Sequence, residues 1–120
     1  DYENVTKDVC KYFSERIDKA KSFGINDIII DPGFGFSKTT QQNYELFNNL
    51  EFFKEFQRPI IVGISRKSMI YKILNTTPEK ALNGSSVLHT ISLMKGANIL
   101  RTHDVKEALE CVKIVSQLNG

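Results

Sequence analysis

Three short apolar segments, separated by stretches of helical pattern, constrain the fold of this chain more than any other feature. They are residues 28–30, 60–64 and 98–100, and each places apolar side chains at adjacent positions. Adjacent apolar positions are typical of strands buried on both faces, which occur mainly in parallel sheets. Parallel strands need a long crossover between them, and here the intervening segments have helical spacing. The sequence therefore predicts an α/β fold.

The predicted helices alternate with these strands. Residues 3–23 repeat apolar side chains at steps of three and four and are followed by Gly24, a typical helix end. A second helix is expected to be capped by Thr39 or Thr40 and to end before Pro59. The remaining predicted helices span residues 69–74, 79–95 and 105–118. The side chains expected to face the core are Val5, Val9, Phe13, Ile17 and Ala20 in the first helix, Leu46, Phe47, Leu50, Phe53 and Phe56 in the second, and Ala108, Leu109, Val112 and Val115 in the last.

The small number of strands suggests that the chain is incomplete. With 120 residues, of which 41% are hydrophobic, it is long enough for one domain. Three buried strands with their helices, however, offer few surfaces to cover both faces and both edges of a sheet. We therefore expect the chain to be part of a larger α/β sheet or barrel.

Composition argues against several classes of partner. The net charge is only +2 and the basic residues are scattered, so neither a nucleic-acid partner nor a membrane partner is expected. No apolar run reaches the roughly 18 residues of a membrane span, and the first residues do not resemble a secretory signal, which favours a cytoplasmic protein. Cys10 and Cys111 lack histidines at ligand spacing and are interpreted as ordinary thiols, and His89 as a packed or surface side chain.

Polar residues follow each predicted strand directly. The segments are DPGFGF after residue 30, SRKS after residue 64 and RTHD after residue 100. Because the carboxyl ends of parallel strands meet on one side of the fold, where ligands bind, these groups are expected to converge. The sequence therefore predicts one ligand site built from three loops.

The residue types in these loops suggest a ligand with two different parts. Asp31 is a lone carboxylate after an apolar strand and suits the adjacent N–H groups of a heterocycle. Arg101 and His103 point the same way in extended backbone and, with the start of the next helix, suit phosphate oxygens. Lys67 and Ser68 supply further donors, and glycines in the loops allow a close approach of backbone and ligand.

The segments DPGFGFSK, VGISRKS and RTHDV, together with NGSS, resemble the C-terminal signature segments of the dihydropteroate synthase family, which joins a pterin to p-aminobenzoate in the folate pathway. The resemblance covers nearly all of the chain. It departs at Ser37, where the family usually has glycine, and at Thr102, where it usually has valine. It implies a (β/α)8 TIM barrel, of which residues 1–120 would be a single unit containing the last three parallel strands and their helices.

The resemblance also implies residue roles. Asp31 and Lys67 would bind the pterin, and Arg101 would lie along the pterin and hold the diphosphate together with His103, which makes these four the catalytic candidates. The other substrate-binding candidates are Phe36 and Ser68 for p-aminobenzoate, Gly63 beside the pterin, and Thr102. Magnesium is implied near the diphosphate, with its ligand in an amino-terminal half outside this chain and none within it.

The implied reaction is displacement of diphosphate from the pterin methylene by the arylamine. The isolated chain is expected to be inactive, and the enzyme to be a homodimer and a sulfonamide target. Two alternatives stay open at this point: a related pterin-binding barrel that transfers a methyl group from a folate to a corrinoid protein, and a non-catalytic binding module.

Overall fold

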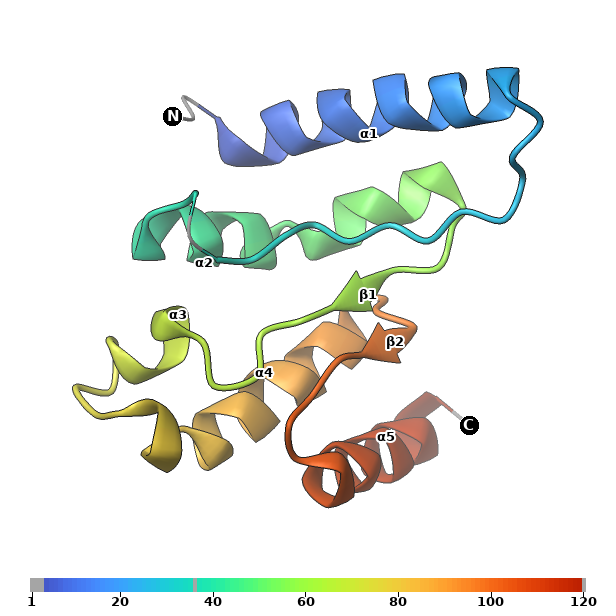
Figure 1. Ribbon diagram of the computed structural model, residues 1–120. Helices are drawn as coiled ribbons and strands as arrows, with labels where there is room; N and C mark the ends of the chain where they lie inside the picture. Colours follow the sequence, from blue (N-terminus) through green and yellow to red (C-terminus); the bar gives the residue numbers. More distant parts are fainter. Residues whose placement is uncertain (1–3, 36, 120) are drawn as a thin grey trace.

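The structure, a computed structural model, describes residues 4–35 and 37–119 (Figure 1). Its α-helices are α1 (Val5–Ser22), α2 (Thr40–Asn48), α3 (Ser68–Tyr71), α4 (Leu82–Met94) and α5 (Val105–Asn119). The 3-10 helices are η1 (Leu50–Phe56) and η2 (Pro78–Lys80), and the strands are β1 (Ile61–Val62) and β2 (Ile99–Leu100). In Figure 1, α1 lies along α2 and η1, and α5 lies beside α4. None of the helices in these residues is long and apolar enough to span a bilayer.

The sheet is parallel, as predicted, although its strands are shorter than expected. Ile61 pairs with Ile99, and the arginine after β2 donates its backbone N–H to the carbonyl of Val62 at 3.0 Å. The prediction of a strand at residues 28–30 is wrong, because there only Ile30 forms a single parallel bridge, with Ile60. Among the described residues this segment has a neighbouring strand on one side only, which leaves most of its backbone unpaired.

The helices cover one face of this sheet. Ile30, Ile60 and Val62 are at most 2% exposed, whereas Ile29 is 57% and Ile99 is 37% exposed. Successive side chains of a strand point to opposite faces, so the second group lies on the face that the helices leave uncovered. The expectation of strands buried on both faces is therefore wrong for this chain.

The predicted first helix is confirmed as α1, which starts two residues later than expected. Asn4 caps it by accepting a hydrogen bond from the backbone N–H of Lys7 at 3.1 Å. Val5, Val9 and Phe13 enter the core as predicted. The ring of Phe13 meets that of Phe53 edge to face, with centroids 5.5 Å apart. This contact fixes α1 against η1.

The predicted second helix is divided into α2 and η1 at Asn49. Thr39 is its N-cap, in a reciprocal capping box with Gln42. The backbone N–H of Asn49 is shared between the carbonyls of Glu45 and Leu46, and its side chain also donates to Glu45. Such competition for the last carbonyls tightens a helix into 3-10 form. The predicted core positions Leu46, Phe47, Leu50 and Phe53 are buried all the same, and Phe56 is half-buried.

Helices α4 and α5 pack against each other near the carboxyl end of the chain. α4 starts at Leu82 rather than 79 because the preceding residues form η2. The prediction that Leu109 and Val112 face the core is wrong, since they are 52% and 41% exposed. The buried residues of α5 are Ala108, Cys111 and Val115. These three residues form a narrower buried face than the one predicted from the apolar residues of this helix, because α4 covers only part of the predicted face.

Candidate active site

The three predicted polar loops leave the sheet at its carboxyl edge. Asp31 follows the bridge residue Ile30, Gly63 follows β1, and Arg101 follows β2. The parallel register places Gly63 opposite Arg101, since the preceding residues pair with each other. The structure therefore brings together the loops that sequence reasoning selected.

Asp31 and Arg101 form an ion pair across β1. Nη1 of Arg101 donates to Oδ2 of Asp31 at 3.2 Å, and the backbone N–H of Gly33 donates to Oδ1 at 2.9 Å. The guanidinium passes directly over Gly63, where an added Cβ would lie 2.3 Å from Nη2. Gly63 thus provides the space in which the arginine crosses the strand. Both charged side chains remain accessible, 57% exposed for the arginine and 37% for the aspartate.

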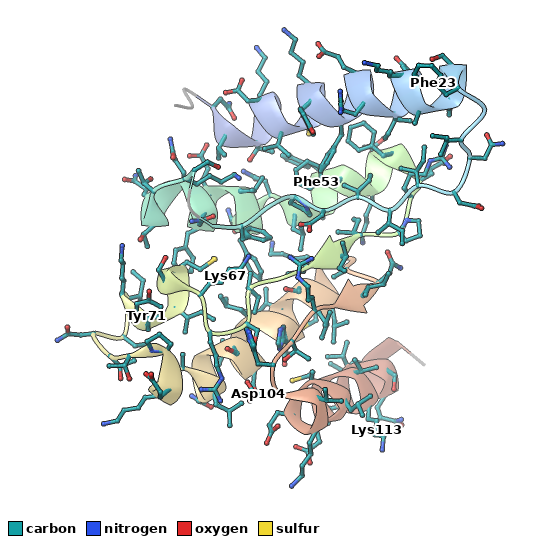
Figure 2. The ribbon with its side chains drawn as sticks, viewed as in Figure 1. Phe23, Phe53, Lys67, Tyr71, Asp104 and Lys113 are labelled. Atoms are coloured by element: carbon teal, nitrogen blue, oxygen red, sulfur yellow. The ribbon has the colours of Figure 1, made fainter. Side chains whose placement is uncertain are left out.

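Lys67 approaches the same region from the loop after β1. Figure 2 shows Lys67 beside the start of α3. Its Nζ donates to the carbonyl of Phe34, which joins this loop to the loop that contains Asp31. Burial lowers the pKa of Lys67, and the nearby charge of Arg101 lowers it further, while Asp31 opposes the shift. Lys67 is therefore a partly desolvated ammonium group next to the ion pair.

A cavity of about 570 Å³ lies beside Lys67. The residues around it are Gly33, Phe34, Gly35, Ser37, Arg66, Lys67, Ser68, Tyr71 and Pro78. Ser68 is the first residue of α3, and the hydroxyl of Tyr44 fixes that helix by donating to the carbonyl of Met69 at 2.6 Å. Burial raises the pKa of Tyr44, so its phenol keeps the proton that this bond uses. Phe36, the predicted apolar partner in this region, lies outside the described residues.

His103 and Thr102 occupy the loop after β2. The backbone N–H of His103 donates to Oγ of Ser65 at 3.2 Å, and its Nδ1 lies 2.9 Å from the same oxygen. Its Nε2 makes no hydrogen bond with any described residue. The hydroxyl of Thr102 accepts the backbone N–H of Asp104 at 2.9 Å, so it shapes the turn before α5. The imidazole is held at one nitrogen and open at the other.

Two charged residues near the site were not among the predicted site residues. Nε and Nη2 of Arg66 donate to the two carboxylate oxygens of Asp104, at 2.9 and 3.0 Å. The hydrogen bonds with Arg66 and its charge lower the pKa of Asp104. The sequence did contain a signal for this pair, because Arg66 and Asp104 have opposite charges and occupy equivalent positions in two adjacent loops.

Acidic and metal-binding side chains do not cluster in this part of the chain. In residues 4–35 and 37–119, no three His, Cys, Asp or Glu side chains come close enough to hold a metal ion. That the residue which binds magnesium lies outside this chain stays a prediction.

Comparison with known families identifies the class of protein. Residues 1–103 match the family model described as pterin binding enzyme. The chain therefore belongs to the pterin binding enzyme family. This agrees with the family resemblance of the three loop segments.

Individual relatives carry a more specific name. The chain is 43% identical over 116 residues to dihydropteroate synthase of Escherichia coli K12, which covers 95% of this chain and 41% of that protein. It is 34% identical to the bifunctional dihydropteroate synthase/dihydropteroate reductase of Helicobacter pylori, covering 98% of this chain and 31% of the relative. The chain thus spans less than half the length of either relative.

Solved structures show the same likeness. Dihydropteroate synthase of Yersinia pestis with a pterine-sulfa conjugate superposes with a TM-score of 0.96 at 37% identity, over 99% of this chain and 48% of that one. The Xanthomonas albilineans enzyme with 4-aminobenzoic acid gives a TM-score of 0.95 at 32% identity, over 100% of this chain and 47% of the other.

Proposed function

We propose that this chain is the C-terminal part of a dihydropteroate synthase. The complete enzyme would condense 6-hydroxymethyl-7,8-dihydropterin diphosphate with p-aminobenzoate to give 7,8-dihydropteroate and diphosphate. The observation that carries the proposal is the meeting of Asp31, Lys67 and Arg101 from three loops at one edge of the sheet. A carboxylate and two cations of this kind match a heterocycle with an attached diphosphate.

The proposal includes the place of the chain in the fold. Residues 1–120 would form one unit of a (β/α)8 barrel and supply the bridge at Ile30, β1 and β2 as its sixth, seventh and eighth strands. The uncovered sheet face supports this, since Ile29 and Ile99 are exposed there and would point into the barrel interior. The relatives' greater length supports it as well.

Pterin binding would use the Asp31–Arg101 pair. The carboxylate of Asp31 accepts one bond from Arg101 and one from Gly33. A pterin that presents two adjacent N–H groups would replace the arginine at Oδ2, while the guanidinium stays over Gly63 and lies along the ring. Lys67 would turn its Nζ from the carbonyl of Phe34 to the carbonyl and ring nitrogen of the pterin.

The reaction would depend on charge placement. The bond between the pterin methylene carbon and the diphosphate oxygen breaks, and its electron pair leaves with the diphosphate. The amine nitrogen of p-aminobenzoate forms the new carbon–nitrogen bond and loses one proton. Arg101 and the open Nε2 side of His103 would stabilise the leaving diphosphate, and Asp31 would offset positive charge on the pterin.

The second substrate would occupy the cavity beside Lys67. Ser68 would donate to its carboxylate, and Phe36 would contact its ring. Gly63 and Thr102 complete the proposed binding residues, the first by allowing close approach and the second by shaping the turn that presents His103. Fixing the amine near the methylene carbon would contribute through orientation.

The proposal extends to magnesium and to assembly. Magnesium, held by a ligand outside this chain, would offset the charge of the diphosphate. A cytoplasmic homodimer is proposed, supported by apolar side chains on the exposed side of α5. They are Val105, Leu109, Val112, Ile114 and Leu118, each at least 41% exposed.

Product analysis of the full-length protein that contains this chain tests the proposal. Incubation with the pterin diphosphate and p-aminobenzoate should yield dihydropteroate and diphosphate, detected by mass spectrometry. We expect Lys67→Ala to lower kcat/KM by about two orders of magnitude. The matched control is Lys113→Ala on the exposed surface of α5. A full-length protein that makes no dihydropteroate, or a Lys67→Ala variant with unchanged kinetics, contradicts the proposal.

Titration calorimetry separates the alternatives. A synthase should bind p-aminobenzoate only after the pterin diphosphate or with added diphosphate. A methyl-transferring barrel should bind a folate without any need for diphosphate, and a binding module should bind its ligand without turnover. The isolated chain of 120 residues should form no product.

A further inference from the structure

Arg66 joins three segments of the chain through its side chain. Two of its nitrogens bind both carboxylate oxygens of Asp104, at the start of α5. The third, Nη1, donates to the carbonyls of Pro78 and Glu79, each at 2.9 Å. The guanidinium therefore links the loop after β1 to the loop after β2 and to η2. Bidentate arginine–carboxylate pairs fix geometry as well as charge.

The backbone of Arg66 is held independently. Its φ is +54°, in the left-handed region that residues with a Cβ seldom adopt. Its N–H donates at 2.8 Å to Oγ of Ser85, whose hydroxyl in turn donates to the carbonyl of Ala81 at 2.8 Å. Ser85 is 1% exposed, so this anchor lies inside the fold. The surroundings therefore hold the turn at Arg66 in place.

The turn at Asp104 is fixed in a similar manner. Its N–H donates to Oγ1 of Thr102, and its carbonyl accepts the first helical bond of α5, from Ala108 at 3.0 Å. One residue earlier in each loop, Ser65 and His103 are hydrogen-bonded to each other. Two adjacent interactions thus connect the loops, the Ser65–His103 hydrogen bonds and the Arg66–Asp104 ion pair.

The proposed substrate-binding residues flank these links. Lys67 and Ser68 follow Arg66 directly, and Arg101 precedes Asp104 by three residues. Asp104 itself is absent from the residues around the cavity, whereas Arg66 is among them. Asp104 is therefore the member of the pair whose replacement tests the link without altering the lining of that cavity.

We propose that Asp104 is a positioning residue, which acts through Arg66 to hold the β1 loop at a fixed distance from the β2 loop. The β1 loop carries side chains that would bind the pterin and p-aminobenzoate, and the β2 loop carries those that would bind the diphosphate. This rests on the proposed function. A fixed distance matters because both substrates must meet at one carbon atom, and small displacements of either lower the rate steeply.

The test uses the full-length protein with Asp104→Asn, which keeps the shape of the side chain and removes its charge. We expect kcat/KM to fall about 10- to 100-fold, through both a lower kcat and a higher KM for p-aminobenzoate. Glu110→Gln, an exposed carboxylate change on α5, should leave both constants within a factor of two. Asp104→Glu, which keeps the charge, should recover part of the loss.

A second readout needs no activity. The pH at which acetic anhydride labels half of Lys67, followed by mass spectrometry, should move toward that of an ordinary lysine in Asp104→Asn. The loop would open, which would expose Lys67 to water and separate it from Arg101. Lys113 should be labelled as before. Should Asp104→Asn fail to fold, Ser85→Ala, which removes the backbone anchor of Arg66, should produce a smaller change in the same direction.

The outcomes are distinguishable. A parent protein without synthase activity contradicts the proposed function, and the labelling result then decides the positioning role. An active parent with unchanged kinetics and unchanged Lys67 labelling in both variants overturns the positioning role alone. A loss of activity that merely follows the loss of folded protein also overturns it.

Discussion

Arg101 lies over Gly63 so closely that a Cβ on the glycine would come within 2.3 Å of Nη2 and 2.8 Å of the central guanidinium carbon. The φ of Gly63 lies outside the left-handed region, so its backbone does not require glycine. The glycine is needed for the space above it. The side chain of Arg101 can therefore reach Asp31 along this path only because residue 63 has no Cβ.

Gly63→Ala should displace Arg101 and weaken its ion pair with Asp31. We expect about a 10- to 100-fold loss of kcat/KM in the full-length protein, mainly through pterin binding, with little loss of stability because Arg101 is exposed. Steady-state kinetics with varied pterin diphosphate measure the loss. In an Arg101→Ala background the same substitution should have almost no further effect, and two fully additive losses would contradict the steric explanation.

The lowered pKa of Lys67 predicts how ligand binding changes with pH. Burial and Arg101 disfavour its charged form, so Lys67 loses its proton at a lower pH than an ordinary lysine. Pterin affinity should therefore weaken as the pH rises, and the decrease should begin below the ordinary lysine pKa of about 10.4. Calorimetric titrations from pH 7 to 10 measure this. Lys67→Arg should abolish this dependence, and an identical pH profile in that variant would contradict it.

Sequence patterns were sufficient for the features that depend on neighbours along the chain. The N-cap of α2, predicted at Thr39 or Thr40 and found at Thr39, the buried faces of α1 and α2, and the parallel order of the three apolar segments all follow from local spacing and residue type. The convergence of the polar loops also followed, because parallel strands place their carboxyl ends together.

The features that the sequence did not predict depend on partners distant in the chain. The apolar residues of α5 spread over a wide part of the helix surface, and their spacing does not indicate which of them α4 covers. Leu109 was therefore predicted to face the core, although it is exposed. The pairing of Arg66 with Asp104 depends on the register of β1 against β2, which hydrophobic pattern alone does not define. The uncovered sheet face at Ile29 reflects how few helices this chain provides.

Phe53 is one of the buried aromatic side chains in the core under α1. Phe53 is 0% exposed and meets Phe13 edge to face, whereas its neighbour Phe52 is 55% exposed. Phe53→Ala should lower the free energy of unfolding by about 3–5 kcal/mol, because it removes buried surface and leaves a cavity. Phe52→Ala should change it by less than about 1 kcal/mol. Urea denaturation of the full-length protein compares the pair, and equal losses would contradict the assigned core.

His89 should make the protein sensitive to mild acid. It is 2% exposed on α4, and its Nε2 has no hydrogen-bond partner among the described residues. Burial lowers its pKa, and the opposing charge of Asp104 only reduces that shift. The unfolded chain therefore binds a proton more readily than the folded one, so this contribution to stability is complete above about pH 6.5 and is lost as the pH falls below it. The lowered pKa of Asp104 acts in the same direction at lower pH, when that carboxylate is protonated.

Replacement of His89 by leucine should remove this acid sensitivity. His89→Leu removes a buried nitrogen that has no hydrogen-bond partner, so we expect the free energy of unfolding to rise by about 1 kcal/mol at pH 7 and by more at pH 5. Urea denaturation of the full-length protein at the two pH values measures the difference. The other histidine, His103, is exposed, and His103→Gln should keep the parent's loss of stability between pH 7 and 5. If His89→Leu loses as much stability over this interval as the parent does, the acid-sensitive group lies elsewhere, because leucine has no proton to gain.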